Sequence, residues 1–407
     1  MKGYLNTKRK EACFGCEACV QVCGKNAISM QEDSEGFRYP VIKEDACVHC
    51  GACNSVCPYE NAPKRGEDKK YVFGGYHKEH KIRFESTSGG AFSAIVEAFC
   101  DDNYVIFGAE AKGLSVFHGF ITQKKELCRF RKSKYSQSIM GNSYEKVKQF
   151  LVQGEKVLFS GTPCQIAGLK AFLKNLNQDN LLTVEVICEG VPSPLYIRKY
   201  EEHLKTKYGC GIEYLDYRYT DTIGKYKGKW DFEVMQTILT KGKKEIKVDR
   251  WFNPFWSIWI SHLMSRPSCY ECPFATQERV ADISLGDLWG VHLYCPELYG
   301  YNGGASLVIA NNDKGKSIVL KAQENMYGHE LLFEDALKYQ GPMRNHISPN
   351  SNREKFMQDL QSYMSYTELN TKWAKKPTLK LLWQKYIWGN RQKVALWKLT
   401  KGKYHIH

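Results

Sequence analysis

The sequence has no uninterrupted apolar run long enough to cross a bilayer, which takes about 20 residues. Its most apolar stretch, Trp251–Met264, is interrupted by Asn253, Pro254 and His262. The opening segment, MKGYLNTKRKEACFGC, also lacks the apolar core of a secretory signal. We therefore expect a cytoplasmic protein whose thiols stay reduced, with attachment to a membrane surface left open.

Acidic residues are absent from residues 371–407, which carry ten Lys and Arg side chains. The chain has 58 basic and 44 acidic residues, a formal charge of +14, so the other 370 residues account for only +4. Four tryptophans interleave with the basic residues of this tail: Trp373, Trp383, Trp388 and Trp397. Such a segment suits an anionic membrane surface, a helical extension packed on the body, or a partner protein. Nucleic acid is disfavoured because the sequence contains no recognised nucleic-acid module.

A hydrophobic fraction of 43% excludes a disordered chain, and 407 residues suggest two or three domains. Composition divides the chain into a cysteine-dense region 1–62, a central region 71–345 and a basic, aromatic region 346–407. The polar segment NAPKRGEDKK reads as the first linker. We expect an α+β ferredoxin-like domain, a mixed α/β domain and a helical C-terminal extension.

In the central region short apolar runs alternate with helical patterns. The patterns predict strands over residues 71–76, 104–108, 115–122, 156–160 and 182–188, and helices over 90–100, 143–152 and 165–173. Within residues 212–250, IEYLDYRY and WDFEVMQTIL flank a Gly/Lys-rich turn and predict a hairpin. This alternation favours a mixed α/β core.

Two cysteine motifs repeat in the first region, CFGCEACVQVC at 13–23 and CVHCGACNSVC at 47–57. Both have the C-x2-C-x2-C-x3-C spacing of two-cluster bacterial ferredoxins, in which the fourth cysteine serves the other cluster. We therefore predict two [4Fe–4S] clusters. Their ligands are Cys13, Cys16, Cys19 and Cys57 for one and Cys47, Cys50, Cys53 and Cys23 for the other. The alternative is a pair of structural zinc sites, for which C-x2-C pairs also serve, but zinc does not call for a third and fourth cysteine repeated identically in each motif.

Four further cysteines form a third candidate set. Cys164 and Cys188 follow two successive predicted strands, so parallel pairing would bring both to one edge of the sheet. Cys269 and Cys272 form a C-x2-C pair that would complete a tetrahedral set. Alternatively, the first two are buried packing residues and the pair is a zinc or redox site. Isolated contexts favour a packing role for Cys100, Cys128, Cys210 and Cys295.

The segments SGTPCQIAGL, CEGVPSP, CYECPFA and ADISLGDLWG resemble the coenzyme F420 hydrogenase/dehydrogenase beta-subunit family, as do STSGGAFSAIV and KSKYSQS. That resemblance implies an iron–sulfur flavoprotein with flavin adenine dinucleotide (FAD) and a [4Fe–4S] cluster, here fused to an N-terminal two-cluster ferredoxin. The third cluster would then be held by Cys164, Cys188, Cys269 and Cys272.

The resemblance also suggests flavin contacts. Ser88, Gly89 and Gly90 precede an apolar helix that can present backbone N–H groups to a pyrophosphate, although a Gly-Gly turn capping a helix explains them equally. Further matching residues are Lys134, Tyr135 and Gln137, for which a solvated loop is the alternative. The resemblance also places Asp282, Asp287 and Trp289 beside the flavin or the third cluster, and the alternative for these residues is a packing role.

Together these features predict an oxidoreductase that transfers electrons between a two-electron donor or acceptor and [4Fe–4S] clusters. The small molecule would be coenzyme F420 or another acceptor, and a redox partner protein would exchange single electrons. Related bacterial sequences occur among polysaccharide biosynthesis genes, so a link to that process is open. The alternatives are a flavin-free iron–sulfur adaptor and a scaffold.

Overall fold

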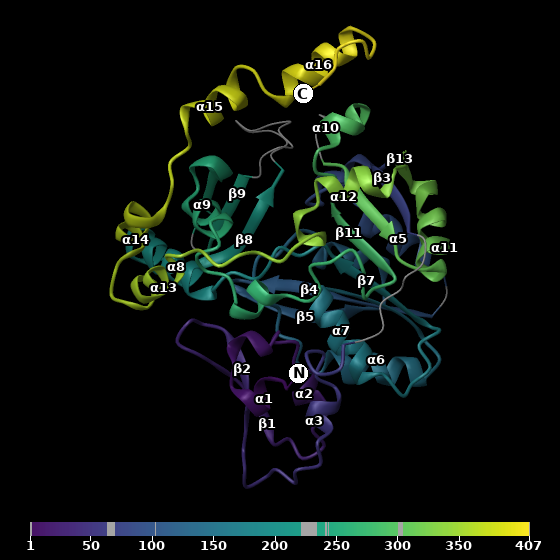
Figure 1. Cartoon of the computed structure of the whole chain (residues 1–407), viewed down its shortest axis with the longest axis vertical. Helices are drawn as coiled ribbons and strands as arrows, with labels where there is room; N and C mark the ends of the chain where they lie inside the picture. The colour runs from purple at the N-terminus through teal and green to yellow at the C-terminus, as the bar shows by residue number, and fades with distance from the viewer. Residues whose placement is uncertain are drawn as a thin grey trace.

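The computed structural model describes residues 2–62, 70–101, 103–220, 234–240, 242, 244–299 and 304–406. The cysteine-rich N-terminal region lies at one end of the molecule and the last two helices lie at the other (Figure 1). Between them are an eight-stranded sheet and a separate three-stranded sheet. This is the mixed α/β architecture that the sequence predicts.

The N-terminal region is built from short elements around one hairpin. Its strands pair antiparallel and its helices each span one turn: β1 (Ile28–Glu32), β2 (Arg38–Ile42), α1 (Tyr4–Thr7), α2 (Ala18–Gln21) and α3 (Ala52–Ser55). α2 begins inside the first cysteine motif and α3 inside the second. Of the predicted linker, residues 63–69 lie outside the described residues.

The large sheet has the strand order β13-β3-β12-β11-β7-β6-β4-β5. Its strands are β3 (Tyr71–His77), β4 (Tyr104–Lys112), β5 (Ser115–Ile121), β6 (Lys156–Gly161), β7 (Leu181–Val186), β11 (Ile283–Asp287), β12 (Ser306–Ala310) and β13 (Met326–Glu330). Four consecutive strands of this order, β11, β7, β6 and β4, run parallel, and antiparallel strands flank them on both sides.

The parallel pairing of β6 with β7, on which the third cysteine set depends, is confirmed. β7 ends at Val186 rather than at the predicted Cys188, so this cysteine lies in the loop beyond the strand. The helix that follows β6 begins at Pro163, earlier than predicted, which puts Cys164 in its first turn. Both cysteines thus follow the carboxyl ends of neighbouring parallel strands.

Helices cover both faces of the large sheet: α4 (His80–Phe84), α5 (Ala91–Phe99), α6 (Ser143–Val152), α7 (Pro163–Phe172) and α11 (Asp313–Ala322). Because strand side chains alternate between faces, Phe107 and Phe159 enter the core on the α6–α7 side. Leu158 enters the core on the α5–α11 side. Phe14 and Cys16 belong to the first of these cores, so the N-terminal region packs directly on the sheet.

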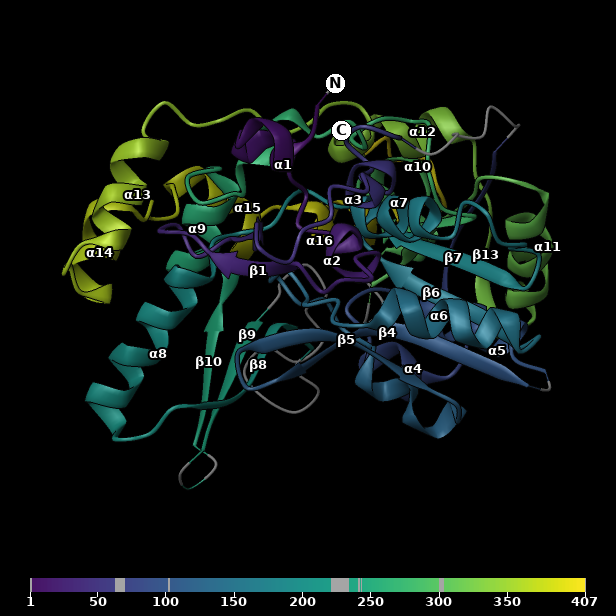
Figure 2. The same ribbon diagram turned by 90° about the horizontal axis from the view of Figure 1, so that it is seen from below.

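The second sheet is antiparallel, with the order β10-β9-β8. Its strands and the helices of the adjoining core are β8 (Ile212–Tyr219), β9 (Val234–Leu239), β10 (Glu245–Asp249), α8 (Pro194–Tyr208), α9 (Pro254–Ile260), α13 (Arg353–Gln361) and α14 (Tyr366–Trp373). The predicted hairpin is present as the β8–β9 pair. Its turn and residues 230–233 lie outside the described residues. In Figure 2, α8 and β10 lie to the left of the large sheet.

The remaining helices are α10 (Val291–Tyr294), α12 (Phe333–Lys338), α15 (Leu379–Tyr386) and α16 (Asn390–Leu399). The prediction of a helical C-terminal extension is confirmed. α16 packs on the body through buried Val394, whereas Trp383 and Trp388 are about half exposed. Among the described residues, no helix combines the length and the apolar character needed to span a membrane.

Candidate functional site

The two cysteine motifs fold into the same backbone path. Gly15 and its counterpart His49 both have positive φ angles, of 66° and 51°. The residues that precede α2 and α3, Glu17 and Gly51, are both left-handed, with φ of 62° and 73°. The repeated spacing therefore encodes a repeated loop and helix start.

The loops bring the predicted first ligand set together. Cys13, Cys16, Cys19 and Cys57 line one cavity, so the fourth cysteine of the second motif reaches the first loop. Burial and the neighbouring thiols raise the pKa of Cys16 and Cys57, because an isolated thiolate is poorly solvated there. Iron ions would supply the compensating positive charge, which is the chemistry of an iron–sulfur site.

The second ligand set lies nearer the surface. Burial raises the pKa of Cys53, the nearby thiols of Cys50 and Cys47 add to that rise, and Cys50 is exposed. The Sγ of Cys23 accepts a hydrogen bond from the backbone N–H of Ala27 at 3.3 Å. N–H···S hydrogen bonds of this kind tune the potential of an iron–sulfur cluster.

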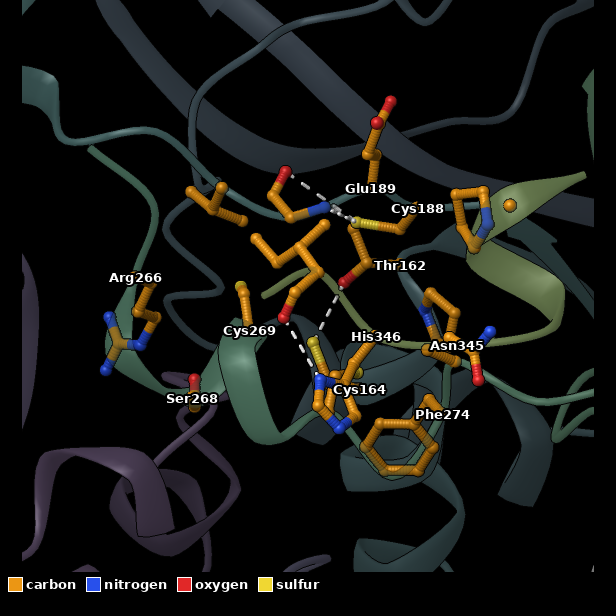
Figure 3. Close-up of a pocket in the computed structure, with 18 of the residues that line it drawn as sticks. Thr162, Cys164, Cys188, Glu189, Arg266, Ser268, Cys269, Phe274, Asn345 and His346 are labelled. Atoms are coloured by element: carbon orange, nitrogen blue, oxygen red, sulfur yellow. Dashed lines mark hydrogen bonds between the residues drawn. The ribbon is translucent and has the colours of Figure 1, made fainter. Parts of the chain in front are cut away.

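The third set lines a cavity of about 390 Å³, and Figure 3 shows three of its members there, Cys164, Cys188 and Cys269. Cys164 comes from the first turn of α7 and Cys188 from the loop after β7. Cys269 lies in the 3-10 helix Pro267–Glu271, and Cys272 follows that helix directly. The structure thus brings all four predicted cysteines to one cavity wall.

Burial and the neighbouring thiols raise the pKa of Cys188, of Cys164 to about 11 and of Cys269 to about 12. Hydrogen bonds also reach the sulfurs: the Cys188 Sγ accepts from Gly190 N–H at 3.4 Å, and the Thr162 hydroxyl lies 3.2 Å from the Cys164 Sγ. Four converging thiols with such partners fit a cubane cluster.

A buried arginine joins this third cavity to the first motif. The Arg266 side chain is 1% exposed and donates from Nε to the carbonyl oxygen of Cys13 at 3.0 Å. Its Nη2 lies 3.6 Å from the Cys13 Sγ, and its Nη1 donates to Gln137 Oε1 at 2.9 Å. Because Arg266 also lines the third cavity, its positive charge acts on both groups of thiols.

Helix α7 forms a second connection between the two sites. A Cβ atom added at Gly168 would lie 3.0 Å from the Sγ of Cys16, so only glycine fits without displacement. Cys164 lies one turn earlier on the same helix, which corresponds to about 6 Å along its axis. Phe14 lines both cavities. The first and third cysteine sets are therefore direct neighbours.

A second opening, also about 390 Å³ but lined by more residues, adjoins the third set, and we call it the large cavity. Its volume is in the range of small-molecule and cofactor sites. Cys164 and Cys188 line this cavity as well as the thiol-lined one. Several cationic side chains that the sequence analysis did not select also line it, namely Arg131, Lys132, Arg218 and Arg250. Arg131, Lys132 and Arg218 pair there with Glu85, Asp216 and Asp287, and an anionic ligand would join these ion pairs.

Five of the six predicted flavin contacts line this large cavity: Ser88, Gly90, Lys134, Tyr135 and Gln137. The sixth, Gly89, packs against backbone, because an added Cβ would lie 2.5 Å from Gly75 O. Burial lowers the pKa of Lys134 to about 8. Gln137 differs from the expectation in that its amide donates to Phe14 O at 2.7 Å, which ties it to the first cysteine loop.

The acidic turn predicted near the flavin divides into two roles. Asp287 and Trp289 line the large cavity, and Asp287 pairs with buried Arg218 at 2.6 Å. Asp282 is a packing residue, since its carboxylate accepts from both the N–H and the hydroxyl of Thr183 at 2.7 Å. For Asp282 the alternative of packing is therefore the one the structure supports.

The fold and the cysteine sites define an iron–sulfur protein of the electron-transfer, oxidoreductase-like class. Residues 12–61 match the 4Fe-4S dicluster domain, and residues 154–331 match the family model for the C terminus of the coenzyme F420 hydrogenase/dehydrogenase beta subunit. Part of the central region is thus similar to the C-terminal domain of that beta subunit, and most of the N-terminal region is similar to a dicluster domain.

Among solved structures, the chain is similar to one from the F420-reducing [NiFe] hydrogenase complex of Methanosarcina barkeri, studied by xenon derivatization. The two are 16% identical over 74% of this chain and 91% of the other, with a TM-score of 0.42. No curated protein matches the chain.

Proposed function

We propose that this protein is an iron–sulfur flavoprotein that exchanges an electron pair with a small molecule in the large cavity and single electrons with a partner protein. The observation that carries the proposal is that Cys164 and Cys188 belong to the walls of both cavities. A cluster on these thiols would lie between a ligand in the large cavity and the first cysteine motif.

The large cavity offers what a dinucleotide needs. When bound, FAD supplies conversion between two-electron and one-electron chemistry. Lys132, Lys134 and Arg131 would neutralise its pyrophosphate, whereas Tyr135, packed against Trp256 and Trp259, would provide an apolar wall. The Arg218–Asp287 pair would anchor the opposite side. The same cationic character favours an anionic small-molecule partner, a class that includes coenzyme F420.

The route for single electrons would run through the N-terminal region. The buried Arg266 and Gly168 keep the first cysteine set against the third set. The loop of the second motif is exposed at Cys50, so it offers the contact surface for a partner protein. Electrons would thus pass from the large cavity through the third, first and second cysteine sets in turn, from the interior to the surface.

Metal and cofactor content tests the proposal. Anaerobically purified protein should contain about twelve irons, as three clusters of four, together with one flavin released on denaturation. The Cys164→Ala variant should lose about four irons, and the control Cys128→Ala, at an exposed cysteine, should lose none. Protein that retains about twelve irons but releases no flavin would instead be the flavin-free adaptor. An unchanged iron content in Cys164→Ala would remove the third site.

The small-molecule partner is identified by its ability to bleach the flavin. Reduced coenzyme F420, NADH, NADPH and reduced ferredoxin are the donors to compare under anaerobic conditions. An anionic two-electron donor should act directly, and reduced ferredoxin should act through the clusters. If reduced ferredoxin alone bleaches the flavin, and does so equally in Cys164→Ala, the proposed series is wrong.

The proposal extends to the C-terminal tail as a contact with anionic lipid surfaces. Large apolar side chains of α15 and the segment after it are exposed, at 86% for Leu379 and 58% for Trp383. They lie in a segment with ten basic and no acidic residues. Vesicles containing phosphatidylserine should bind the full chain, and binding should fall when Trp383 and Trp388 are both changed to alanine. Equal flotation of both proteins would remove the membrane contact.

A further inference from the structure

Three side chains outside the three cysteine sets converge on one point. Cys295 ends α10, Glu297 lies in the 3-10 helix Pro296–Leu298, and His329 lies on the edge strand β13. The Cys295 Sγ is 3.1 Å from His329 Nε2 and 3.4 Å from Glu297 Oε1. The same Oε1 is 3.1 Å from the same Nε2, which closes a triangle of one sulfur, one oxygen and one nitrogen.

This triangle has close to the dimensions of a metal site. Bonds of about 2.0–2.3 Å at tetrahedral angles place neighbouring sulfur, nitrogen and oxygen ligands roughly 3.3–3.6 Å apart. The observed separations are shorter by only a few tenths of an ångström. Each residue points its single best donor atom at the others, although hydrogen bonding alone would be satisfied by two of the three contacts.

We propose that Cys295, Glu297 and His329 bind a divalent transition-metal ion, with Zn²⁺ the best match to this donor set. A thiolate and a carboxylate would balance the two positive charges, and the neutral imidazole would complete the protein ligands. Cys295 is fully buried, whereas the side chains of Glu297 and His329 are 48% and 47% exposed. The ion would therefore enter from solvent and keep a fourth position open to water.

The site is independent of the iron–sulfur series because its ligands lie on other elements. The third cysteine set follows the interior strands β6 and β7, whereas β13 is an edge strand. A bound ion would fasten β13 to the α10 segment, which begins shortly after Trp289 in the wall of the large cavity. It would thus stabilise an edge strand and, indirectly, one wall of that cavity.

Zinc titration of the anaerobic, cluster-loaded full-length protein tests the site. Zinc should bind at one equivalent per chain, with iron content unchanged. His329→Gln and Glu297→Gln alter half-exposed side chains, so both variants should fold normally but bind zinc with a lower association constant. For His329→Gln the decrease should exceed ~100-fold, which is more than the loss of a residue that only hydrogen-bonds to a metal ligand would cause. The controls Cys128→Ala and His80→Gln change an exposed cysteine and an exposed histidine and should bind as the wild type does.

Zinc-edge X-ray absorption separates this site from zinc misplaced in a cluster site. The proposed ligands predict one sulfur at about 2.3 Å and lighter neighbours at about 2.0 Å. A shell of four sulfurs, or unchanged zinc binding by His329→Gln and Cys295→Ala, would overturn the proposal. Slower hydrogen exchange in β13 and α10 after zinc addition is the expected structural consequence, and unaltered exchange there would remove the proposed fastening role.

Discussion

The two cysteine motifs share one spacing and one backbone path but have opposite surroundings. In the first loop, every residue from Phe14 to Ala18 is buried. In the second, every residue from Val48 to Gly51 is exposed. The corresponding positions show the consequence: a Cβ at Gly15 would lie 2.5 Å from the Gln137 amide nitrogen, whereas His49 occupies the same place in the open loop.

This difference assigns different tasks to similar clusters. A cluster against Arg266 and α7 would be shielded from water and coupled to the third cysteine set. A cluster beneath the exposed loop would be close to solvent and to a partner protein. Spacing defines the ligands, and the surrounding protein defines the potential and the direction of contact.

The largest effect is expected where α7 meets the first motif. Gly168→Val would push branched carbons into the Cys16 thiol and should remove about four of twelve irons, because one cluster no longer fits. Iron analysis and the spectrum of the reduced protein measure this. Gly24→Ala is the matched control, since nothing lies within 4 Å of its Cβ position. Full iron content in Gly168→Val would show that the first cluster does not lie against α7.

The next largest effect is expected from removal of the buried positive charge of Arg266. Arg266→Met keeps the length of the side chain but removes a positive charge beside Cys13, so the first-set cluster should become harder to reduce by on the order of 100 mV. Lost hydrogen bonds to Cys13 O, Arg38 O and Gln137 should also cost about 3 kcal/mol of stability.

Potentiometric titration followed by electron paramagnetic resonance measures that shift. The second-set cluster should change little, and Arg198→Met, which breaks an exposed pair with Glu32, should leave all potentials in place. A shift of equal size in both ferredoxin-type clusters would argue against the contrast between the two motifs.

The two motifs should also differ in the rate at which a chelator removes their iron. A chelator should first take about four irons from the exposed second set, and only later the irons held by the buried first loop. The loss is followed by the absorbance of the iron–chelate complex and the remaining spin signals. Loss of iron from both motifs in a single kinetic phase would contradict the proposed effect of their different surroundings.

The smallest expected effect concerns the large cavity. The pKa of Lys134 is lowered to about 8 by burial, so in the empty cavity this side chain loses its charge as the pH rises above 8. A bound pyrophosphate favours the charged form, and the dissociation constant for FAD should therefore rise about tenfold between pH 7 and 9. Lys134→Met should bind FAD more weakly, and its dissociation constant should not change in this way with pH. FAD titration of protein from which the flavin has been removed measures both effects.

Local spacing predicted which cysteines line the first N-terminal cavity, because all four cysteines of each motif lie within one loop and helix start. Cys164 and Cys188 were also predictable, since parallel strands end at one edge of a sheet. Arg266 was not, because its partner Cys13 is 253 residues away and no local pattern links them. The same holds for Cys295, which the sequence analysis assigned to packing and which meets His329 34 residues later.

The central claim is that the thiols shared by the two cavities connect them electronically. Photoreduction of the bound flavin, with rapid freezing and electron paramagnetic resonance, tests this without a physiological donor. In the wild type the clusters should become reduced after the flavin. In Cys188→Ala, with about eight irons retained, the flavin should be reduced while the ferredoxin-type clusters stay oxidised. Reduction of those clusters at the wild-type rate would contradict the account.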